Sequence, residues 1–338
     1  MELHPIGDSG VEISTVGLGG GPSGNLLAPM TDDDADLLLH AAVDRGVRYF
    51  DTAPLYGMGL AETRLGRALG RHGRERLVVS TKVGRLLAAD APPDPDMYHD
   101  GEPFFKDTPA LNPLWDFSRE GTSRSIEESL ARLGLGTVDI ALLHEPPERC
   151  LSQAVDAGYQ ALRDLRDARV IRAVGVGWDR VDVMAQLVCE LALDCVLVAG
   201  RYTLLDQSAL DQLMPGCLER NVAVIAGGVF NSGILADPGA TYDYVPASRQ
   251  IRERVQMLTR ICERWSTPLK SVALQFPLAH PAVAGIVLGM RTVAELTENL
   301  ELLEFPVPSG LWSDLRRASL LPETAPLPGG RDPRTGRG

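Results

Sequence analysis

The chain has 338 residues, of which 44% are hydrophobic, and a formal net charge of −12 at pH 7. This negative charge argues against a nucleic-acid partner, whose backbone binds basic surfaces. No apolar run reaches the roughly 18 residues of a membrane span, and Met1–Pro5 shows no sign of a signal peptide. The five cysteines are scattered, so we expect them to be reduced. We therefore expect a soluble cytoplasmic protein with no membrane partner.

The first elements expected along the chain are a hairpin and a helix. Segments 2–6 and 11–13 flank the turn Gly7–Gly10, an arrangement typical of a β-hairpin. A helix is expected to start at Thr31, because three aspartates follow it and suit the positive end of the helix dipole. Gly46 is expected to end this helix.

The rest of the sequence alternates β-type and helix-type segments, as in a parallel sheet. The eight expected strands are residues 15–18, 47–50, 77–81, 138–143, 171–176, 195–198, 222–226 and 283–288. The helical segments expected between them include 125–133, 151–169, 208–220, 249–265 and 292–303. Because neither a repeat nor a linker is visible, we predict one α/β domain, a (β/α)₈ barrel, over residues 1–320.

Two segments do not fit this alternation. Residues 85–117 form a long connection rich in Pro and Asp, and an unstructured connection of this length is usually a functional loop or a lid. Residues 321–338 are rich in Pro and Gly and are expected to form a frayed or extended tail.

Three of the expected strands are followed directly by an ionisable residue, namely Asp51, Lys82 and His144. Tyr56 follows the first of them on a loop bounded by glycine. The carboxyl ends of barrel strands converge on one face, where such barrels carry catalysis. There Lys82 would lower the pKa of the Tyr56 phenol, Asp51 would balance the charge of Lys82, and His144 would bind a substrate oxygen. Singly, each residue has a plain structural explanation; together they predict proton transfer to or from an oxygen.

These residues resemble the signature of the aldo-keto reductase family. The matching positions are Asp51-Thr52-Ala53, Tyr56-Gly57, Glu62, Gly66, Thr81-Lys82 and His144. The resemblance implies that Tyr56 is the proton donor or acceptor, that Lys82 and Asp51 tune it, and that His144 orients the substrate oxygen. It further implies hydride transfer between a nicotinamide and a carbonyl or alcohol, in a barrel whose base is closed by an N-terminal hairpin.

Two other sequence patterns concern metal binding and dinucleotide binding. No metal site is expected, because the six histidines show neither H-x-H nor H-E-x-x-H spacing. The run Gly19–Gly24 matches the dinucleotide motif G-x-G-x-x-G, but its helix starts only at Thr31 and Pro22 lacks an N–H. We interpret these glycines as a close-approach loop at the barrel mouth, with Gly20 near the nicotinamide.

By resemblance, residues 286–299 hold the adenosine end of the cofactor, with Glu298 and Asn299 at the adenine. NADPH-preferring relatives place Lys and Arg where this chain has Gly289 and Glu295, and Arg291 is the cation left in the motif. A carboxylate repels a 2′-phosphate. The expected cofactor is therefore NAD, with NADP as the alternative; Glu295 could also merely cap or solvate a helix.

Two further positions differ from many relatives. Trp178 stands where a Ser-Asn pair binds the nicotinamide amide, and a glycine-rich loop replaces the aromatic that stacks on the ring. Either Trp178 or Phe230 would supply that aromatic surface. The backbone N–H groups of Asn231, Ser232 and Gly233 are candidates for the pyrophosphate.

The resemblance is strongest to the branch of sugar 1-dehydrogenases (L-fucose, D-threo-aldose, L-galactose) and pyridoxal 4-dehydrogenase. Members oxidise a cyclic hemiacetal to a lactone. The small-molecule substrate, whether an aldose, an aldehyde or a pyridoxal-like compound, stays open. Phe104, Trp115 and Trp178 are candidates for stacking on it.

Two functions are alternatives to a hemiacetal dehydrogenase. One is an NADPH-dependent aldehyde or ketone reductase of detoxification or secondary metabolism; the other is a nucleotide-sensing regulatory barrel without turnover. Glu295 argues against the first, and the intact Tyr56–Lys82 set against the second. The sequence indicates neither the oligomeric state nor the preferred direction of reaction.

Overall fold

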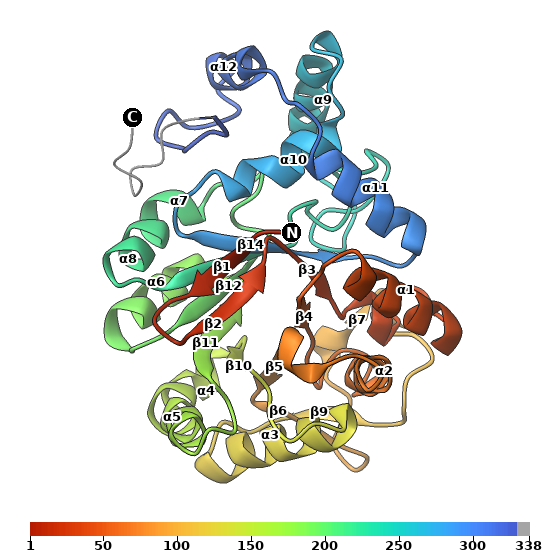
Figure 1. The fold of residues 1–338 in the computed structure, drawn as a ribbon, viewed down its shortest axis with the longest axis vertical. Coiled ribbons are helices and arrows are strands. Elements are labelled where there is room, and N and C mark those ends of the chain that lie inside the picture. Colours follow the sequence, from red (N-terminus) through yellow and green to blue (C-terminus); the bar gives the residue numbers. More distant parts are fainter. Residues whose placement is uncertain (330–338) are drawn as a thin grey trace. The chain divides into compact units, whose positions relative to one another are not determined.

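Eight parallel strands form a closed barrel in the computed structural model, which describes residues 1–329 (Figure 1). The strands are β3 (Val16–Gly19), β4 (Tyr49–Asp51), β5 (Val78–Val83), β10 (Ile140–His144), β11 (Ala173–Trp178), β12 (Cys195–Ala199), β13 (Ala223–Gly227) and β14 (Val283–Gly289). They follow one another around the barrel in chain order. The expected (β/α)₈ fold is confirmed, and each expected strand is present with ends shifted by at most two residues.

The helices are α1 (Asp32–Asp44), α2 (Leu60–Leu69), α3 (Arg119–Leu133), α4 (Glu148–Gln153), α5 (Tyr159–Asp167), α6 (Val181–Glu190), α7 (Ala209–Gln212), α8 (Met214–Glu219), α9 (Arg249–Arg264), α10 (Leu269–Leu278), α11 (Val293–Leu303) and α12 (Ser309–Arg317). As expected, the Thr31 hydroxyl caps α1 by accepting the N–H of Asp34. The helix expected over 151–169 contains a π-helical turn, Ala154–Gly158. Within residues 1–329, every helix is too short or too polar to cross a lipid bilayer.

The described chain forms two compact units, which we treat one by one. The first contains Met1–Trp178, Leu193–Val196 and Leu288–Val293, and the second contains the remaining described residues. The expected domain boundary at residue 320 stays a prediction. Leu321 and Ala325 are buried, so the chain is packed here rather than frayed as expected; residues 330–338 of the expected tail lie outside the described part.

In the first unit, the N-terminal hairpin lies at the amino end of a barrel strand. β1 (Leu3–Ile6) pairs with β2 (Val11–Ser14) in antiparallel register. The Ser14 hydroxyl accepts the N–H groups of Arg48 and Tyr49, where β4 begins. The hairpin therefore closes the base of the barrel, opposite the face at which the strands end.

The segment after β5 has more structure than expected. β6 (Arg85–Ala88) pairs antiparallel with β9 (Asn112–Trp115), and between them β7 (Tyr98–His99) pairs with β8 (Glu102–Pro103). The expectation of a long unstructured connection was therefore wrong. Such short strands carry little periodicity, and the pairing of β6 with β9 joins residues more than 20 positions apart in sequence.

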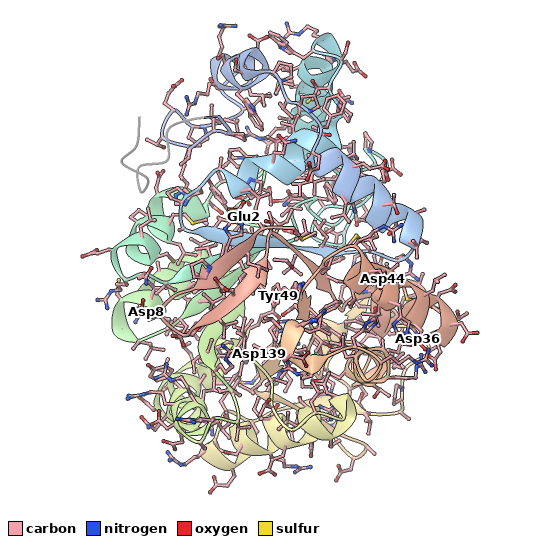
Figure 2. All side chains as sticks on the ribbon, viewed as in Figure 1. Glu2, Asp8, Asp36, Asp44, Tyr49 and Asp139 are labelled. Atoms are coloured by element: carbon pink, nitrogen blue, oxygen red, sulfur yellow. The ribbon has the colours of Figure 1, made fainter. Side chains whose placement is uncertain are left out.

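Buried polar groups set the register of the catalytic strands from outside the barrel. Asp139, labelled in Figure 2, accepts the N–H of Val79 at 2.8 Å and is paired with Arg74 at 2.8 Å. Glu62 of α2 is fully buried and accepts the hydroxyl of Thr81 at 2.7 Å and Nε of Arg132 at 2.6 Å. Each carboxylate therefore fixes β5 against a neighbouring element.

Candidate active site

Three neighbouring strands of the first unit bring the expected ionisable residues together. Asp51 is the last residue of β4 and His144 the last of β10, while Lys82 lies one residue before the end of β5. In the parallel register Asp51 is opposite Ser80, and Lys82 is opposite Leu142. The side chains of Asp51, Lys82 and His144 are all nearly inaccessible to solvent.

The ammonium group of Lys82 makes three hydrogen bonds. Nζ donates to Oδ2 of Asp51 at 2.7 Å, to the carbonyl oxygen of Thr52 at 3.0 Å and to the hydroxyl of Tyr56 at 3.0 Å. A lysine ammonium has three donors, so all of its capacity is used. Lys82 therefore connects a fixed carboxylate to the Tyr56 oxygen.

Asp51 is held by a second chain of hydrogen bonds. Its Oδ1 accepts the hydroxyl of Ser80 at 2.7 Å, and the oxygen of Ser80 lies 2.9 Å from the hydroxyl of Tyr49. Because Ser80 donates to Asp51, Tyr49 donates to Ser80. This network fixes both carboxylate oxygens before any substrate binds.

Tyr56 is placed by a close approach of two glycines. A Cβ on Gly24 would lie 2.5 Å from the backbone carbon of Tyr56, and one on Gly57, whose φ is +66°, would lie 2.4 Å from the oxygen of Gly24. The short turn Pro22–Gly24 thus packs directly against the Tyr56 loop. This confirms that the glycine run serves close approach rather than a dinucleotide-binding helix.

Opposing effects act on the pKa of Tyr56. Burial raises it, the ammonium of Lys82 lowers it, and the net pKa lies above its usual value. The expected influence of Lys82 is thus present but does not outweigh burial. Burial by itself would lower the pKa of Lys82, but the charges of Asp51 and Tyr56 raise it above the ordinary range. Lys82 therefore stays charged, and Tyr56 is a phenol at neutral pH.

His144 is a neutral imidazole beside Tyr56. Its ring centroid is 6.0 Å from that of Tyr56, edge to face. Burial and the positive charges of Arg85 and Lys82 hold the pKa of His144 well below its usual value. Nδ1 is buried and has no hydrogen-bond partner within residues 1–329. The ring can therefore donate from one nitrogen without becoming charged.

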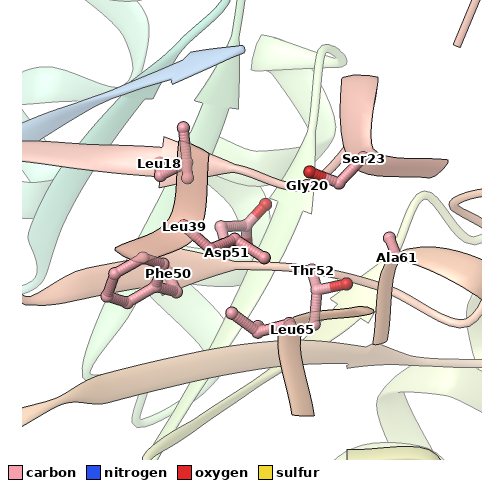
Figure 3. Close-up of a pocket in the computed structure, with 9 residues that line it drawn as sticks. All are labelled: Leu18, Gly20, Ser23, Leu39, Phe50, Asp51, Thr52, Ala61 and Leu65. Carbon is pink, nitrogen blue, oxygen red and sulfur yellow. The ribbon is translucent and has the colours of Figure 1, made fainter. Parts of the chain in front are cut away.

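Behind this group lies a small cavity, drawn in Figure 3. Its lining includes Asp51, Thr52 and Gly20 together with apolar side chains such as Leu18 and Phe50. The Thr52 hydroxyl is buried and lacks a partner in the described chain. Most of the lining is hydrocarbon.

Aromatic side chains from the inserted segment lie next to Tyr56. Phe104 and Tyr56 pack against one buried cluster that contains Phe105, whose ring centroid is 6.2 Å from that of Tyr56. Trp115 is partly buried, and the guanidinium carbon of Arg85 lies 4.1 Å from its ring centroid. The structure thus brings Phe104 close to Tyr56. At Trp115, by contrast, the guanidinium of Arg85 covers one side of the ring.

Four of the expected cofactor residues belong to the first unit. Gly20 donates its N–H to the carbonyl of Asp51 at 2.7 Å, and Trp178 is the buried last residue of β11. Gly289 ends β14 and is exposed. Arg291 donates to the carbonyl oxygens of residues 26, 28 and 29 at 3.2, 2.9 and 2.7 Å. Its guanidinium is therefore already committed to the chain.

In the second unit, the loop after β13 satisfies its own polar groups. The side chain of Asn231 accepts from Thr203 at 2.6 Å and donates to the carbonyl of Gly200 at 3.0 Å. The N–H of Asn231 donates to Gly228 and that of Gly233 to Phe230. Of the three N–H groups that are candidates for the pyrophosphate, those of Asn231 and Gly233 therefore already have acceptors within the loop, and the role of this loop in binding a pyrophosphate stays a prediction. Ser232 accepts the N–H of Tyr244 through its hydroxyl.

The second unit also carries the three expected cofactor positions of α11. Glu298 is ion-paired with Lys270 at 2.7 Å, and the ammonium of Lys270 lies 5.9 Å from the ring centroid of Phe230. Glu295 is in the first turn of the helix. Oδ1 of Asn299 is buried without a partner in the described chain. An orphaned acceptor of this kind fits the amino group of an adenine, so the residues present fit a nicotinamide dinucleotide.

Sequence reasoning missed four residues of the site. Ser80 lies two residues before Lys82, so strand alternation places both on one face and could have identified it. Phe105 follows Phe104 in the sequence, and Phe104 is a residue predicted to stack on the substrate. Arg85 and Glu145 carried no signal, since their ion pair of 2.7 Å joins residues 60 positions apart.

Comparisons with known proteins agree with this geometry. The model of the Aldo/keto reductase family matches residues 15–319. A D-threo-aldose 1-dehydrogenase from Pseudomonas is 39% identical, with 93% of this chain and 96% of that protein covered. A pyridoxal 4-dehydrogenase from Microbacterium luteolum is 36% identical, covering 95% and 98%. An aldo-keto reductase structure from Bacillus halodurans, in its holo form, shares the fold with a TM-score of 0.75 at 23% identity, covering 98% of this chain and 100% of that one.

Proposed function

Since the chain belongs to the aldo-keto reductase family, a family of NAD(P)-dependent oxidoreductases, we propose that it is a dehydrogenase that oxidises the cyclic hemiacetal of a small molecule to a lactone. The observation that carries this proposal is the buried hydrogen-bonded set of Tyr56, Lys82 and Asp51 beside a neutral His144. This set moves a proton to or from one oxygen atom.

In the proposed mechanism, the protein handles the proton, and a bound nicotinamide dinucleotide would supply the hydride acceptor. Tyr56, as a phenolate, takes the proton of the anomeric hydroxyl, and the Lys82 ammonium stabilises the phenolate across 3.0 Å. His144 donates a hydrogen bond to the same oxygen. In the reverse reaction the Tyr56 phenol returns the proton to the carbonyl oxygen.

We propose that Asn299, Glu298 and Gly289 contact the adenosine end of the cofactor, and that Gly20 and either Trp178 or Phe230 lie at its nicotinamide side. The assignment rests on the family resemblance, and the orphaned acceptor of Asn299 supports it. We further propose that NAD is preferred. The hydrogen bonds of Arg291 to three carbonyl groups support this choice, because moving its guanidinium to a 2′-phosphate would break them.

The proposed substrate is an aldose or a pyridoxal-like hemiacetal. Two similar proteins support this class, since their names give D-threo-aldose and pyridoxal as substrates. Phe104, Trp115 and the nearby Phe105 supply aromatic surface for a ring. The buried side chain of Arg85 and the half-buried side chain of Glu145 supply polar contacts for hydroxyl groups.

A substrate panel tests the proposal. L-fucose, L-galactose, D-arabinose, pyridoxal and simple aldehydes are assayed with NAD and with NADP, in both directions. We expect oxidation of at least one hemiacetal with kcat/KM well above the reduction of any simple aldehyde. Turnover confined to aldehydes and NADPH would favour the reductase alternative, and no turnover at all would favour the sensing barrel.

A further inference from the structure

An ion pair beside the catalytic residues takes no part in the mechanism above. Nη2 of Arg85 donates to Oε2 of Glu145 at 2.7 Å. The Arg85 side chain is only 7% exposed, whereas that of Glu145 is 36% exposed. The pair thus joins a buried cation to a carboxylate that a ligand can reach.

The barrel register places this pair directly after the catalytic strands. Val83 of β5 is opposite Leu143 of β10, and this is the last pair in the ladder between these two strands. His144 is the next residue on one strand, and Glu145 follows it at once. The carboxylate therefore belongs to Glu145, the residue directly after His144, which binds the reacting oxygen in the proposed mechanism.

Backbone geometry shows that the position of Glu145 is imposed. Its φ is +45°, a left-handed conformation that side chains other than glycine and asparagine rarely adopt. The N–H of Glu145 donates to the carbonyl of Gly177 on β11 at 3.1 Å, which fixes this conformation. Strained residues of this kind concentrate at binding and catalytic sites.

Arg85 is also held by Trp115. It is paired in register with Trp115 of β9, and its guanidinium carbon lies 4.1 Å from the indole centroid. Its Nε is buried without a partner in residues 1–329. A guanidinium fixed in this way orients the Glu145 carboxylate and keeps a positive charge next to it.

We propose that Glu145, oriented by Arg85, is a specificity-determining residue that accepts a hydrogen bond from the hydroxyl on the carbon next to the reacting carbon. The proposal rests on the proposed function and narrows its substrate class to aldoses. An aldose carries a hydroxyl at that carbon, whereas the corresponding carbon of pyridoxal carries none. A carboxylate is a strong acceptor for hydroxyl groups, and its bonds are stronger than those of neutral acceptors.

Binding of an unreactive sugar tests this contact without requiring turnover. The probes are 1,5-anhydro-L-fucitol, which lacks the anomeric hydroxyl, and its counterpart without the 2-hydroxyl, each titrated into the protein saturated with NAD. We expect the wild-type protein to bind the 2-hydroxylated compound about 10-fold more tightly, as one hydrogen bond to a charged group provides. In Glu145→Ala this ratio is expected to fall to about 1.

Three variants separate recognition from a structural role. Glu148→Ala removes an exposed carboxylate three residues further on and is expected to keep the wild-type ratio. Glu145→Gln preserves shape and is expected to reduce the ratio only in part, whereas Arg85→Lys keeps the charge and should keep most of the ratio. Thermal unfolding of each variant checks that it is folded.

Several outcomes would overturn the proposal. They are equal wild-type affinities for the two probes, binding of neither, or an equal loss for both probes in Glu145→Ala and Glu145→Gln. The proposed function fails separately, when the wild-type protein oxidises no hemiacetal in the substrate panel. A protein that oxidises pyridoxal and ignores the 2-hydroxyl would retain the dehydrogenase function and refute the role of Glu145.

Discussion

The ammonium group of Lys82 lies 3.0 Å from the hydroxyl of Tyr56, while its other two donors are held by Asp51 and the carbonyl of Thr52. Of these three acceptors, the carboxylate is fixed by Ser80 and the carbonyl belongs to the backbone. The Tyr56 oxygen alone can change its protonation as part of a reaction. Proton transfer in this site is therefore directed to one atom.

We expect Tyr56→Phe to lower turnover by about 10²–10⁴-fold, because it removes the group that gives and takes the proton. The dissociation constant of the nicotinamide cofactor should stay near that of the wild-type protein, since the ring itself is kept. Steady-state kinetics and a cofactor titration measure both quantities. Near-normal turnover would refute the mechanism.

The rate of oxidation should rise with pH through the alkaline range. Oxidation needs the phenolate of Tyr56, and burial places the pKa of this phenol above its usual value. The base form therefore grows as the pH increases toward that pKa, whereas reduction uses the phenol and falls over the same range. A pH profile of kcat in both directions measures this. A maximum for oxidation at acidic pH would contradict the assignment.

Lys82→Met should shift the alkaline limb of the oxidation profile to higher pH, because the charge that lowers the Tyr56 pKa is lost. The variant also leaves the buried Asp51 carboxylate unpaired, which costs about 3–5 kcal/mol of folding free energy. The double variant Lys82→Met with Asp51→Asn removes that charge and should recover stability but not the profile. An unchanged profile in an active variant would refute the coupling.

His144 should stay neutral at every pH where the enzyme works. Burial and the charges of Arg85 and Lys82 hold its folded pKa well below the value of about 6.5 in the unfolded chain. Below that value the unfolded state binds a proton that the folded state does not, so His144 makes the fold less stable as the pH falls. The His144→Gln variant should lose part of this acid sensitivity in urea unfolding at pH 5 compared with pH 7. Imidazole NMR shifts that move near pH 6.5 would show the assignment to be wrong.

Much of the barrel and its catalytic face was predictable, because both depend on patterns local to the chain. Strand alternation and the ionisable residues Asp51, Lys82 and His144 at strand ends are visible in sequence. Each expected strand ends one or two residues early; at β4 and β10 the missing residue is polar, yet Asp51 and His144 still belong to the ladder.

The parts that sequence did not predict depend on distant partners. The ion pair of Arg85 with Glu145 and the pairing of β6 with β9 join segments that nothing in either one specifies. The N–H groups of Asn231 and Gly233, two of the three pyrophosphate candidates, donate to carbonyls of the same loop, which the sequence did not indicate. The sequence of a glycine-rich loop does not indicate which hydrogen bonds its backbone makes within the loop.

Cofactor choice provides the last prediction. A 2′-phosphate carries up to two negative charges and needs a cation when it is partly desolvated. In the first unit, Arg291 donates to three carbonyl oxygens, so moving it to a phosphate would break those bonds. In the second unit, Lys270 is paired with Glu298 at 2.7 Å. The resemblance places a carboxylate, Glu295, where NADPH-preferring relatives carry a cation, so we expect the native protein to use NAD better than NADP.

Glu295→Arg should shift the kcat/KM ratio toward NADP by roughly 10- to 100-fold, since it removes a repulsive charge and adds a guanidinium that binds phosphate, a change of about 1–3 kcal/mol. Glu301→Arg makes the same charge change at an exposed position further along α11 and should leave the ratio near its native value. Kinetics with both cofactors at low and high salt measure the shift, which should shrink at high salt because a partly exposed contact is screened. A native preference for NADP would mean that Arg291 leaves its carbonyl partners for the phosphate, and Arg291→Met would then lower kcat/KM for NADP selectively. An equal shift in the Glu301 variant would instead mean that only net charge acts, and that Glu295 does not lie at the ribose.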